Sequence, residues 1–160
     1  MKRSRHPRRF LTAREREQIS AAIAAAERET SGEIRVHLAA RCPGDPYVEA
    51  TRVFQMLGMQ KTRHRNGVLI YLATADRRFA IVGDEGIHRR VPESFWDDVA
   101  AEMARRFRES DFCDGICTAV RMVGEHLAAY FPPLPGDVNE LPDVVSTDEG
   151  RPGKDGRRKA

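Results

Sequence analysis

The chain has 160 residues, 41% of them hydrophobic and 32% charged, which is enough for one globular domain with a highly charged surface. The formal charge of +3 arises at the two ends: residues 1–11 carry +5 and residues 151–160 carry +4, which leaves −6 for residues 12–150. A short basic arm binds any polyanion without specificity, so we expect no specific nucleic-acid site, although the tails remain candidates for contacts with nucleic acid or an acidic partner. The sequence contains no run of about 18 apolar residues, so we expect no membrane span.

The location is predicted to be cytoplasmic. The basic N-terminus is not followed by an apolar segment, so no secretory signal is expected. Three cysteines, Cys42, Cys113 and Cys117, form an odd set without a disulfide pattern, which is typical of a reducing compartment. Cys113 and Cys117 would share one face of a helix, but without further thiolate or imidazole ligands nearby, packing is favoured over a zinc site.

The first half of the chain predicts a helix, a strand and a second helix. Thr12 and Glu15 form a capping box at the start of the first helix. Residues 33–40 alternate between apolar and polar types, which indicates a strand with one partly wet face near a sheet edge and a solvated His37. Asp45 and Pro46 begin the second helix. Its core-facing positions are predicted to be Tyr47, Ala50, Phe54 and Leu57.

Two adjacent strands form the centre of the predicted fold. Residues 68–73 are six consecutive apolar residues, typical of a strand buried on both faces. The short segment 74–76 predicts a hairpin turn into a second strand, 77–82. A strand, a helix and a strand at this spacing form a crossover unit, so strands 33–40 and 68–73 should be parallel and strand 77–82 antiparallel to the latter.

Two helices follow, and then the composition changes. Pro92 begins a helix that buries Trp96, and a last helix after residue 115 carries Ile116, Val120, Val123, Leu127 and Tyr130 inward. We therefore predict a three-layer α/β/α sandwich with a small, mixed, mostly parallel sheet, in the order α-β-α-β-β-α-α, over residues 12–131. Residues 1–11 are predicted to be a disordered basic arm, and residues 132–160 an extended to disordered tail.

This topology brings acidic and amide groups to one edge of the sheet. The strands would place Glu33, Asn66, Asp84 and Glu85 at the same rim. Carboxylate and amide oxygens are the ligands that a hard cation such as Ca²⁺ or Mg²⁺ requires. Alternatively, acidic residues are common in turns, and the two glycines around Asp84 and Glu85 can simply mark tight backbone.

Other motifs are less informative. The loop with Asp111 and Asp114 could reach the same rim, or the two residues could cap the last helix. Ser31 has no obvious base beside it and does not form a nucleophile. The Gly83-x-x-Gly86 sequence is neither a Walker nor a dinucleotide-binding fingerprint.

Several segments, in this order and spacing, resemble the TPM-domain family, which includes a thylakoid-lumen protein described as an acid phosphatase. The matching segments are residues 30–36, 66–73, 81–87, 95–97, 111–116 and 139–143, which together span residues ~12–145. The resemblance implies an α/β sandwich, divalent-metal binding with calcium as the first candidate, and weak phosphatase activity. Two departures bear on catalysis more than on fold: Gly83-Asp84-Glu85-Gly86 replaces a Gly-x-Gly turn ending in Glu, and Arg65 stands where many relatives have Asp or Asn.

Two functions follow from the rim and the resemblance. The first is a metal-dependent phosphomonoesterase, in which Asp84 is a metal ligand, Glu85 a ligand or general base, and Asp111 or Asp114 supporting ligands. The second is a non-catalytic adaptor or protein-maintenance module with a structural metal site, acting on a protein partner.

Overall fold

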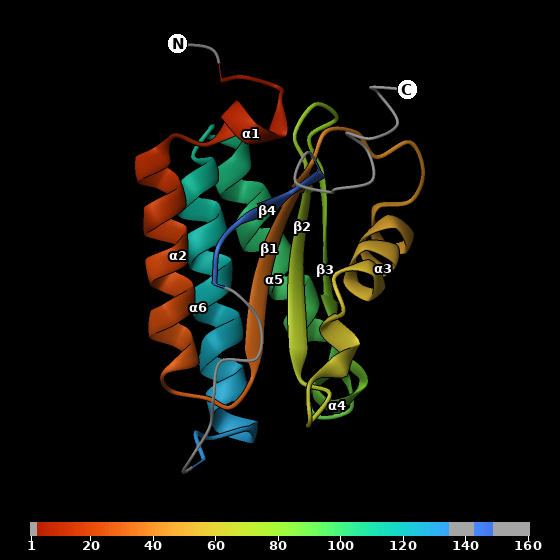
Figure 1. Ribbon diagram of the computed structural model, residues 1–160, viewed down its shortest axis with the longest axis vertical. Helices are drawn as coiled ribbons and strands as arrows, with labels where there is room; N and C mark the ends of the chain where they lie inside the picture. Colours follow the sequence, from red (N-terminus) through yellow and green to blue (C-terminus); the bar gives the residue numbers. More distant parts are fainter. Residues whose placement is uncertain (1–2, 135–142, 149–160) are drawn as a thin grey trace, which may run out of the picture.

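A computed structural model describes residues 3–134 and 143–148 of the chain, which form a sheet flanked by helices (Figure 1). The helices are α1 (Pro7–Phe10), α2 (Ala13–Glu27), α3 (Pro46–Met56), α4 (Glu85–His88), α5 (Glu93–Arg108) and α6 (Phe112–Tyr130), with a 3₁₀ turn at Met59–Lys61. The strands are β1 (Glu33–Ala39), β2 (Gly67–Ala73), β3 (Arg78–Gly83) and β4 (Ser146–Thr147).

The sheet has the strand order β3-β2-β1-β4. β1 and β2 run parallel with Glu33 opposite Gly67, and β3 runs antiparallel to β2 with Gly83 opposite Val68. The crossover unit and the hairpin predicted from the sequence are therefore confirmed.

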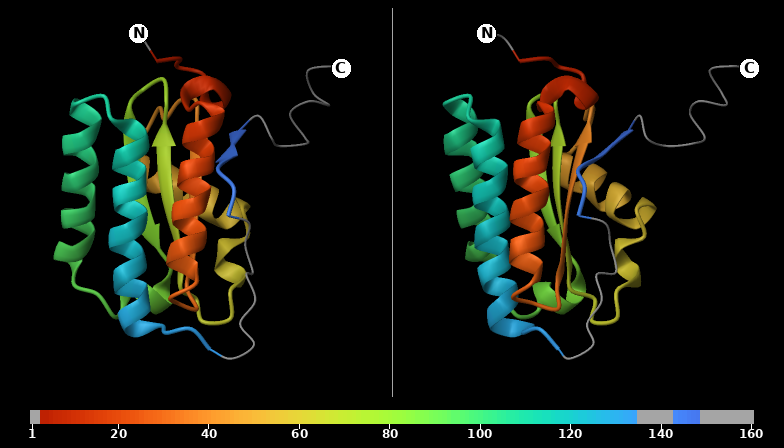
Figure 2. Two further views of the ribbon diagram at one scale, coloured as in Figure 1. Left: turned by 90° about the vertical axis from the view of Figure 1, so that its left-hand side faces the viewer. Right: turned by 60° about the vertical axis from the view of Figure 1, so that its left-hand side comes forward.

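The two faces of the sheet are covered by different helices. Figure 2 shows α2, α5 and α6 side by side on one face, where they contribute to the larger hydrophobic core. α3 covers the other face, and Ala50, Val53 and Phe54 form a smaller core with Leu69 and Tyr71. The predicted three-layer α/β sandwich is confirmed. No helix among the described residues is long and apolar enough to cross a bilayer.

Two tyrosines assigned to the core by helical spacing are exposed. Tyr47, in the first turn of α3, is 48% exposed, and Tyr130, in the last turn of α6, is 38% exposed. Both lie in terminal turns of their helices, where fewer neighbouring side chains cover them.

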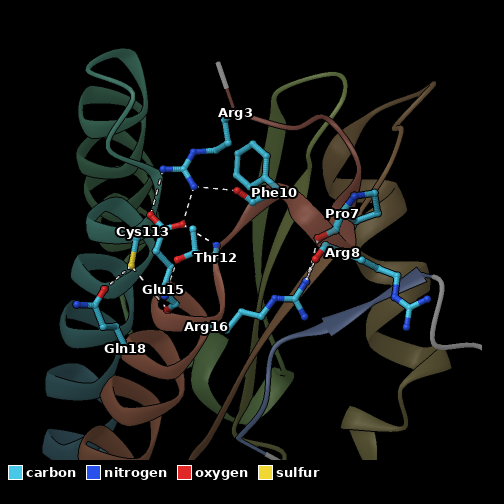
Figure 3. A network of polar contacts seen from close by, with 9 residues as sticks. All are labelled: Arg3, Pro7, Arg8, Phe10, Thr12, Glu15, Arg16, Gln18 and Cys113. Carbon is cyan, nitrogen blue, oxygen red and sulfur yellow. Dashed lines mark hydrogen bonds and ion pairs between the residues drawn. The ribbon is translucent and has the colours of Figure 1, made fainter. Parts of the chain in front are cut away.

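The N-terminal arm is folded onto the domain instead of disordered. Arg3 donates to both carboxylate oxygens of Glu15 and to the main-chain oxygen of Phe10, and Arg16 donates to the main chain of α1 (Figure 3). Phe10 is buried and packs edge-on against Phe112 with ring centroids 4.9 Å apart. The charge pattern indicated a solvated arm because it does not show the two-residue apolar anchor of Phe10 and Leu11, which is buried.

The C-terminal segment also contributes to the sheet. Ser146 pairs with His37, so β4 covers part of the outer edge of β1, which agrees with the predicted position of this strand near a sheet edge. His37, predicted to be solvated, is buried. Part of the segment predicted as an extended to disordered tail thus belongs to the sheet, whereas the basic residues 151–160 lie outside the described part.

Candidate functional site

The rim predicted from the strand directions is present at the end of the sheet where β1 and β2 begin and β3 ends (Figure 1). The main-chain N–H of Glu33 donates to the carbonyl of Asn66 at 3.4 Å, and the N–H of Asp84 donates to the carbonyl of Gly67 at 2.9 Å. Glu33, Asn66 and Asp84 are all buried. The structure therefore brings three of the predicted site residues together, with Glu85 directly after them.

The Asp84 carboxylate is hydrogen-bonded to an arginine and to the N-terminus of a helix. Its two carboxylate oxygens accept from Nε and Nη2 of Arg65, each at 2.8 Å, and one oxygen also accepts from the N–H of Glu85 at the start of α4. Glu85 is 54% exposed, with Arg65 at 3.6 Å and Arg89 at 3.3 Å. The sequence placed a carboxylate pair here but did not predict that Arg65 would neutralise it.

The Arg65 side chain is directed to Asp84 by an uncommon backbone conformation. Arg65 has a φ of +51°, in the left-handed region that L-residues other than Asn and Asp rarely adopt. Its carbonyl accepts from the N–H of Gly86 at 2.8 Å. The preference for Asp or Asn that the resemblance implies at this position therefore agrees with its backbone geometry.

The glycines around the acidic turn have a packing explanation. A Cβ at Gly86 would lie 2.5 Å from the carbonyl oxygen of Arg65 and closer still to that of His64, so only glycine allows this backbone approach. A Cβ at Gly83 would lie 2.7 Å from the Trp96 indole. The Gly83-Asp84-Glu85-Gly86 pattern is thus accounted for by tight backbone, and its glycines are not evidence for a metal.

Asn66 is the rim residue with an unmet requirement. Its Nδ2 donates to the hydroxyl of Ser31 at 3.4 Å, whereas its Oδ1 is buried without a hydrogen-bond partner among the described residues. The Thr62 hydroxyl, in the loop before β2, is also buried without a hydrogen-bond partner among the described residues. A buried acceptor without a donor costs about 1–3 kcal/mol, so the rim gains stability from any donor or cation that reaches it.

A carboxyl group that the sequence did not single out lies beside the rim. Glu27, at the end of α2, accepts from the N–H of Ile34 at 2.7 Å. Burial, the Asp143 side chain and the charge of Glu33 raise the pKa of Glu27 to about 9. Asp143 is remote in sequence and reaches Glu27 only because β4 pairs with β1, so no local pattern could have indicated this cluster.

Asp111 and Asp114 lie at the other end of the molecule. They belong to the start of α6, next to Phe112, which packs against Phe10 and the Arg77 side chain at the hairpin. Asp114 pairs with Arg106, and Asp111 occupies the N-cap position of α6 without a side-chain capping bond. Their predicted contribution to the rim is wrong, because α5 runs the full length of the sheet and carries the loop away.

A second polar cluster joins β4 to the sheet. Nδ1 of the buried His37 lies 2.7 Å from the Ser146 hydroxyl, and Nε2 lies 2.9 Å from an oxygen of Asp148. The His37 ring is stacked near Tyr71, whose centroid is 6.3 Å away. Together these contacts tie a two-residue strand to an interior strand of the sheet.

The metal implied by the family resemblance fits this rim only in part. No group of three or more His, Cys, Asp and Glu side chains within the described ranges is arranged to hold a metal ion. The groups that suit a hard cation are the buried Glu33 carboxylate and the unpartnered Asn66 Oδ1. Asp84 would become available only if Arg65 released it.

Comparisons with known proteins agree with the fold. The protein is similar to the BA42 protein of the psychrophilic bacterium Bizionia argentinensis, with 42% identity over 86% of this chain and 95% of that chain and a TM-score of 0.81. The N-terminal domain of cg2496 from Corynebacterium glutamicum (18% identity, 72% of each chain, TM-score 0.58) and that of a P. gingivalis protein (18% identity, 76% of this chain and 78% of that chain, TM-score 0.62) share the fold. None of the curated proteins compared with the chain matches it.

The family assignment rests on most of the chain. The TPM domain model, which carries the name TPM phosphatase, matches residues 5–126, from the N-terminal arm to the last third of α6. The chain belongs to the TPM-domain family.

Proposed function

We propose that this chain is a non-catalytic TPM module whose strand rim binds a divalent cation, Ca²⁺ as the first candidate and Mg²⁺ as the second. The observation that carries this proposal is the buried Asn66 Oδ1, which has no partner among the described residues, in a rim whose main chain also joins Asn66 to the buried Glu33. A cation would coordinate the Asn66 oxygen and balance the negative charge of the rim carboxylates, and it would stabilise the rim as a surface for a protein partner.

The residues divide into two groups in this proposal. Glu33 and Asn66 would hold the cation directly. Asp84 and Glu85 would coordinate the cation only after Arg65, which donates to both oxygens of Asp84, had moved away. This competition predicts modest affinity, because a guanidinium must be displaced before the ligand set is complete.

The test is a thermal-unfolding titration of the full chain with Ca²⁺, with Mg²⁺, and with a chelator as reference. We expect Ca²⁺ to raise the melting temperature of the wild type and to shift amide NMR signals at Glu33, Asn66 and Asp84. Glu33→Gln should abolish the stabilisation. Asp111→Asn removes an acidic group at the far end of the molecule and is the matched control, so it should respond like the wild type.

A different result would overturn the proposal. If neither cation changed the melting temperature at millimolar concentration, the rim would not be a cation site. If Asp111→Asn abolished the response and Glu33→Gln did not, the cation would bind at the start of α6.

The second candidate is weak acid phosphatase activity. Arg65 and Arg89 flank the carboxylates of Asp84 and Glu85, and guanidinium groups match the charge and geometry of phosphate. In hydrolysis of a phosphomonoester, water would add to phosphorus, the ester P–O bond would break, and the alcohol would leave with a proton. Glu85 would take the proton from the attacking water and pass it to the leaving alcohol oxygen, and a divalent cation would neutralise phosphate charge.

Activity can be assigned to the rim only with matched variants. Hydrolysis of p-nitrophenyl phosphate should fall at least tenfold in Glu85→Gln and in Asp84→Asn if the rim is catalytic, and should be unchanged in Asp111→Asn. Equal rates in all four proteins would place the activity outside the rim and leave the non-catalytic proposal in force.

A further inference from the structure

A groove of about 540 Å³ lies along the free edge of the sheet, and none of the rim carboxylates lines it. Its floor is the outer edge of β3, at Ala80, Ile81 and Gly83, and its walls are formed by α3 and α5 from the two faces of the sheet. Figure 1 shows β3 as the last strand on this side, next to α3. Tyr47 of α3 and Trp96 of α5 are the largest side chains in the walls.

The main chain of β3 offers hydrogen-bonding groups to this groove. The bond from the Asp84 N–H to the Gly67 carbonyl shows which residues along β3 direct their main-chain groups toward β2. Alternate residues therefore direct their N–H and C=O groups away from β2, namely Phe79, Ile81 and Gly83. β3 ends the strand order, and no backbone bond among the described residues uses these outward groups.

The strand edge is enclosed, which distinguishes it from an ordinary solvated edge. Ile81 is only 9% exposed, so its outward groups lie in a sheltered channel. Trp96 lies against the end of the strand, and its Nε1 is buried without an acceptor in the described structure. Unpaired donors and acceptors in a sheltered channel favour an occupant that supplies a regular row of main-chain partners, as an extended peptide does.

The charge of the groove wall adds a second requirement. Glu93 and Asp97 lie four residues apart on α5, so they share a face of the helix and both line the groove. Both are exposed, and neither forms an ion pair with another described residue. Among the described residues that line the groove, His88 is the only one with a basic side chain, and it stacks on Trp96. An occupant with lysine or arginine side chains would complement this wall.

We propose that the groove between α3 and α5 binds an extended, basic segment of a partner polypeptide, which adds to the edge of β3 as a fifth strand. The outward groups of Phe79, Ile81 and Gly83 supply the main-chain bonds. Tyr47 and the edge of β3 provide apolar contact area, and Glu93 and Asp97 select for positive charge. The proposal does not depend on the cation site, since no residue of the groove is among the cation ligands.

The experiment uses the full chain and a phage-displayed library of random eight-residue peptides. Selected sequences should be enriched in lysine or arginine and in β-branched residues, and a selected synthetic peptide should slow amide exchange at Phe79, Ile81 and Gly83. Charge reversal, Glu93→Lys with Asp97→Lys, should weaken binding of that peptide at least tenfold while the NMR spectrum keeps the signals of the folded domain. Glu17→Lys with Arg14→Glu, on the exposed face of α2, is the control and should leave binding unchanged.

Three results would overturn the proposal. The first is a selection that enriches no basic sequences over the charge-reversed protein, and the second is a peptide that shifts signals at α2 and α6 and not at β3. Slow amide exchange at Phe79, Ile81 and Gly83 in the chain alone would show that the edge is already covered, by the chain itself or by a second copy. A sedimentation measurement then distinguishes those two cases.

Discussion

The hairpin end of the sheet is closed by aromatic rings, whereas the rim end is closed by charged and amide groups. At the hairpin end, Phe10 and Phe112 pack together, and the guanidinium groups of Arg3 and Arg77 lie over both rings at 4.7–5.5 Å. At the rim, Asp84 is held by Arg65, and Asn66 keeps a buried oxygen without a partner among the described residues.

This difference separates stability from function. Aromatic burial and cation–π contacts satisfy every group that they involve, so the hairpin end offers little for a ligand to improve. The rim retains buried polar groups whose energy falls when a donor or cation reaches them. Substitutions at the hairpin end should therefore change the free energy of unfolding alone, whereas those at the rim should also change the response to cations.

The largest loss of stability is expected for Phe112→Ala at the hairpin end. It removes a buried ring that contacts Phe10, Phe107 and two arginines, so we expect a loss of about 3–5 kcal/mol in the free energy of unfolding. Urea denaturation measures this, with the exposed Val48→Ala as control. If Phe112→Ala lost less than about 1 kcal/mol, the N-terminal arm would not be anchored on this ring.

The next largest effect is expected at the rim for Gly86→Ala. The added Cβ would collide with the main chain of His64 and Arg65, which cannot move as a flexible side chain does, so we expect a loss of about 2–3 kcal/mol. Gly44→Ala is the matched control, because a Cβ there meets nothing within 4 Å. Equal stability of the two variants would mean that the loop before β2 can shift, and that the rim is less rigid than its backbone contacts indicate.

The rim could be predicted from the sequence because it depends only on strand directions. One crossover and one hairpin are enough to place Glu33, Asn66 and Asp84 at the same edge, and local patterns indicate both connections. The positions of Asp111 and Asp114 depend on the length and direction of α5 relative to the sheet, and spacing within the loop carries no information about that.

The missed contacts have a common cause. His37 meets Ser146 across 109 positions, and Glu27 meets Asp143 through the same strand pairing, which involves only two residues of β4. A strand that short has no periodicity to recognise. The Arg65–Asp84 pair depends on a left-handed residue, which the sequence does not indicate for an arginine.

Glu27→Gln tests whether the raised pKa of Glu27 makes the stability of the rim depend on pH. The folded-state pKa of Glu27, about 9, is above its ordinary value of 4.5, so the folded chain keeps a proton that the unfolded chain loses. This contribution to stability is complete below pH 4.5 and is lost as pH rises towards 9. With a chelator present, we expect the stability of the wild type to fall between pH 5 and 9 and that of Glu27→Gln to fall less.

The control for the pH experiment is Glu17→Gln, an exposed position on the same helix, which should follow the wild type. If Glu27→Gln and the wild type had the same pH dependence, the carboxyl group would be ionised in the folded chain. The rim would then carry one more negative charge than we describe.

Arg65→Asn is expected to affect stability and cation binding at the rim in opposite directions. It removes two charge-assisted bonds to the buried Asp84, but asparagine tolerates the left-handed backbone better, so we expect a net loss of about 1–2 kcal/mol without cation. It also frees Asp84 as a ligand, so Ca²⁺ should stabilise this variant more than the wild type. Arg89→Asn, which removes an exposed arginine that contacts Glu85, should change both quantities little.

The smallest effect is expected for Ser146→Ala, which lies at neither end of the sheet. The substitution removes the hydroxyl that His37 contacts at 2.7 Å, so we expect a loss of about 1 kcal/mol, confined to the attachment of β4. Faster amide exchange in β4 and at the β1 edge, with unchanged exchange in β2, would confirm this, and the exposed Ser94→Ala is the control.

Because β4 also brings Asp143 to Glu27, the variant should in addition lower the pKa of Glu27. If β4 loosened without any change in the titration of Glu27, the high pKa would come from burial and the charge of Glu33 without Asp143, and the rim would be independent of the C-terminal strand.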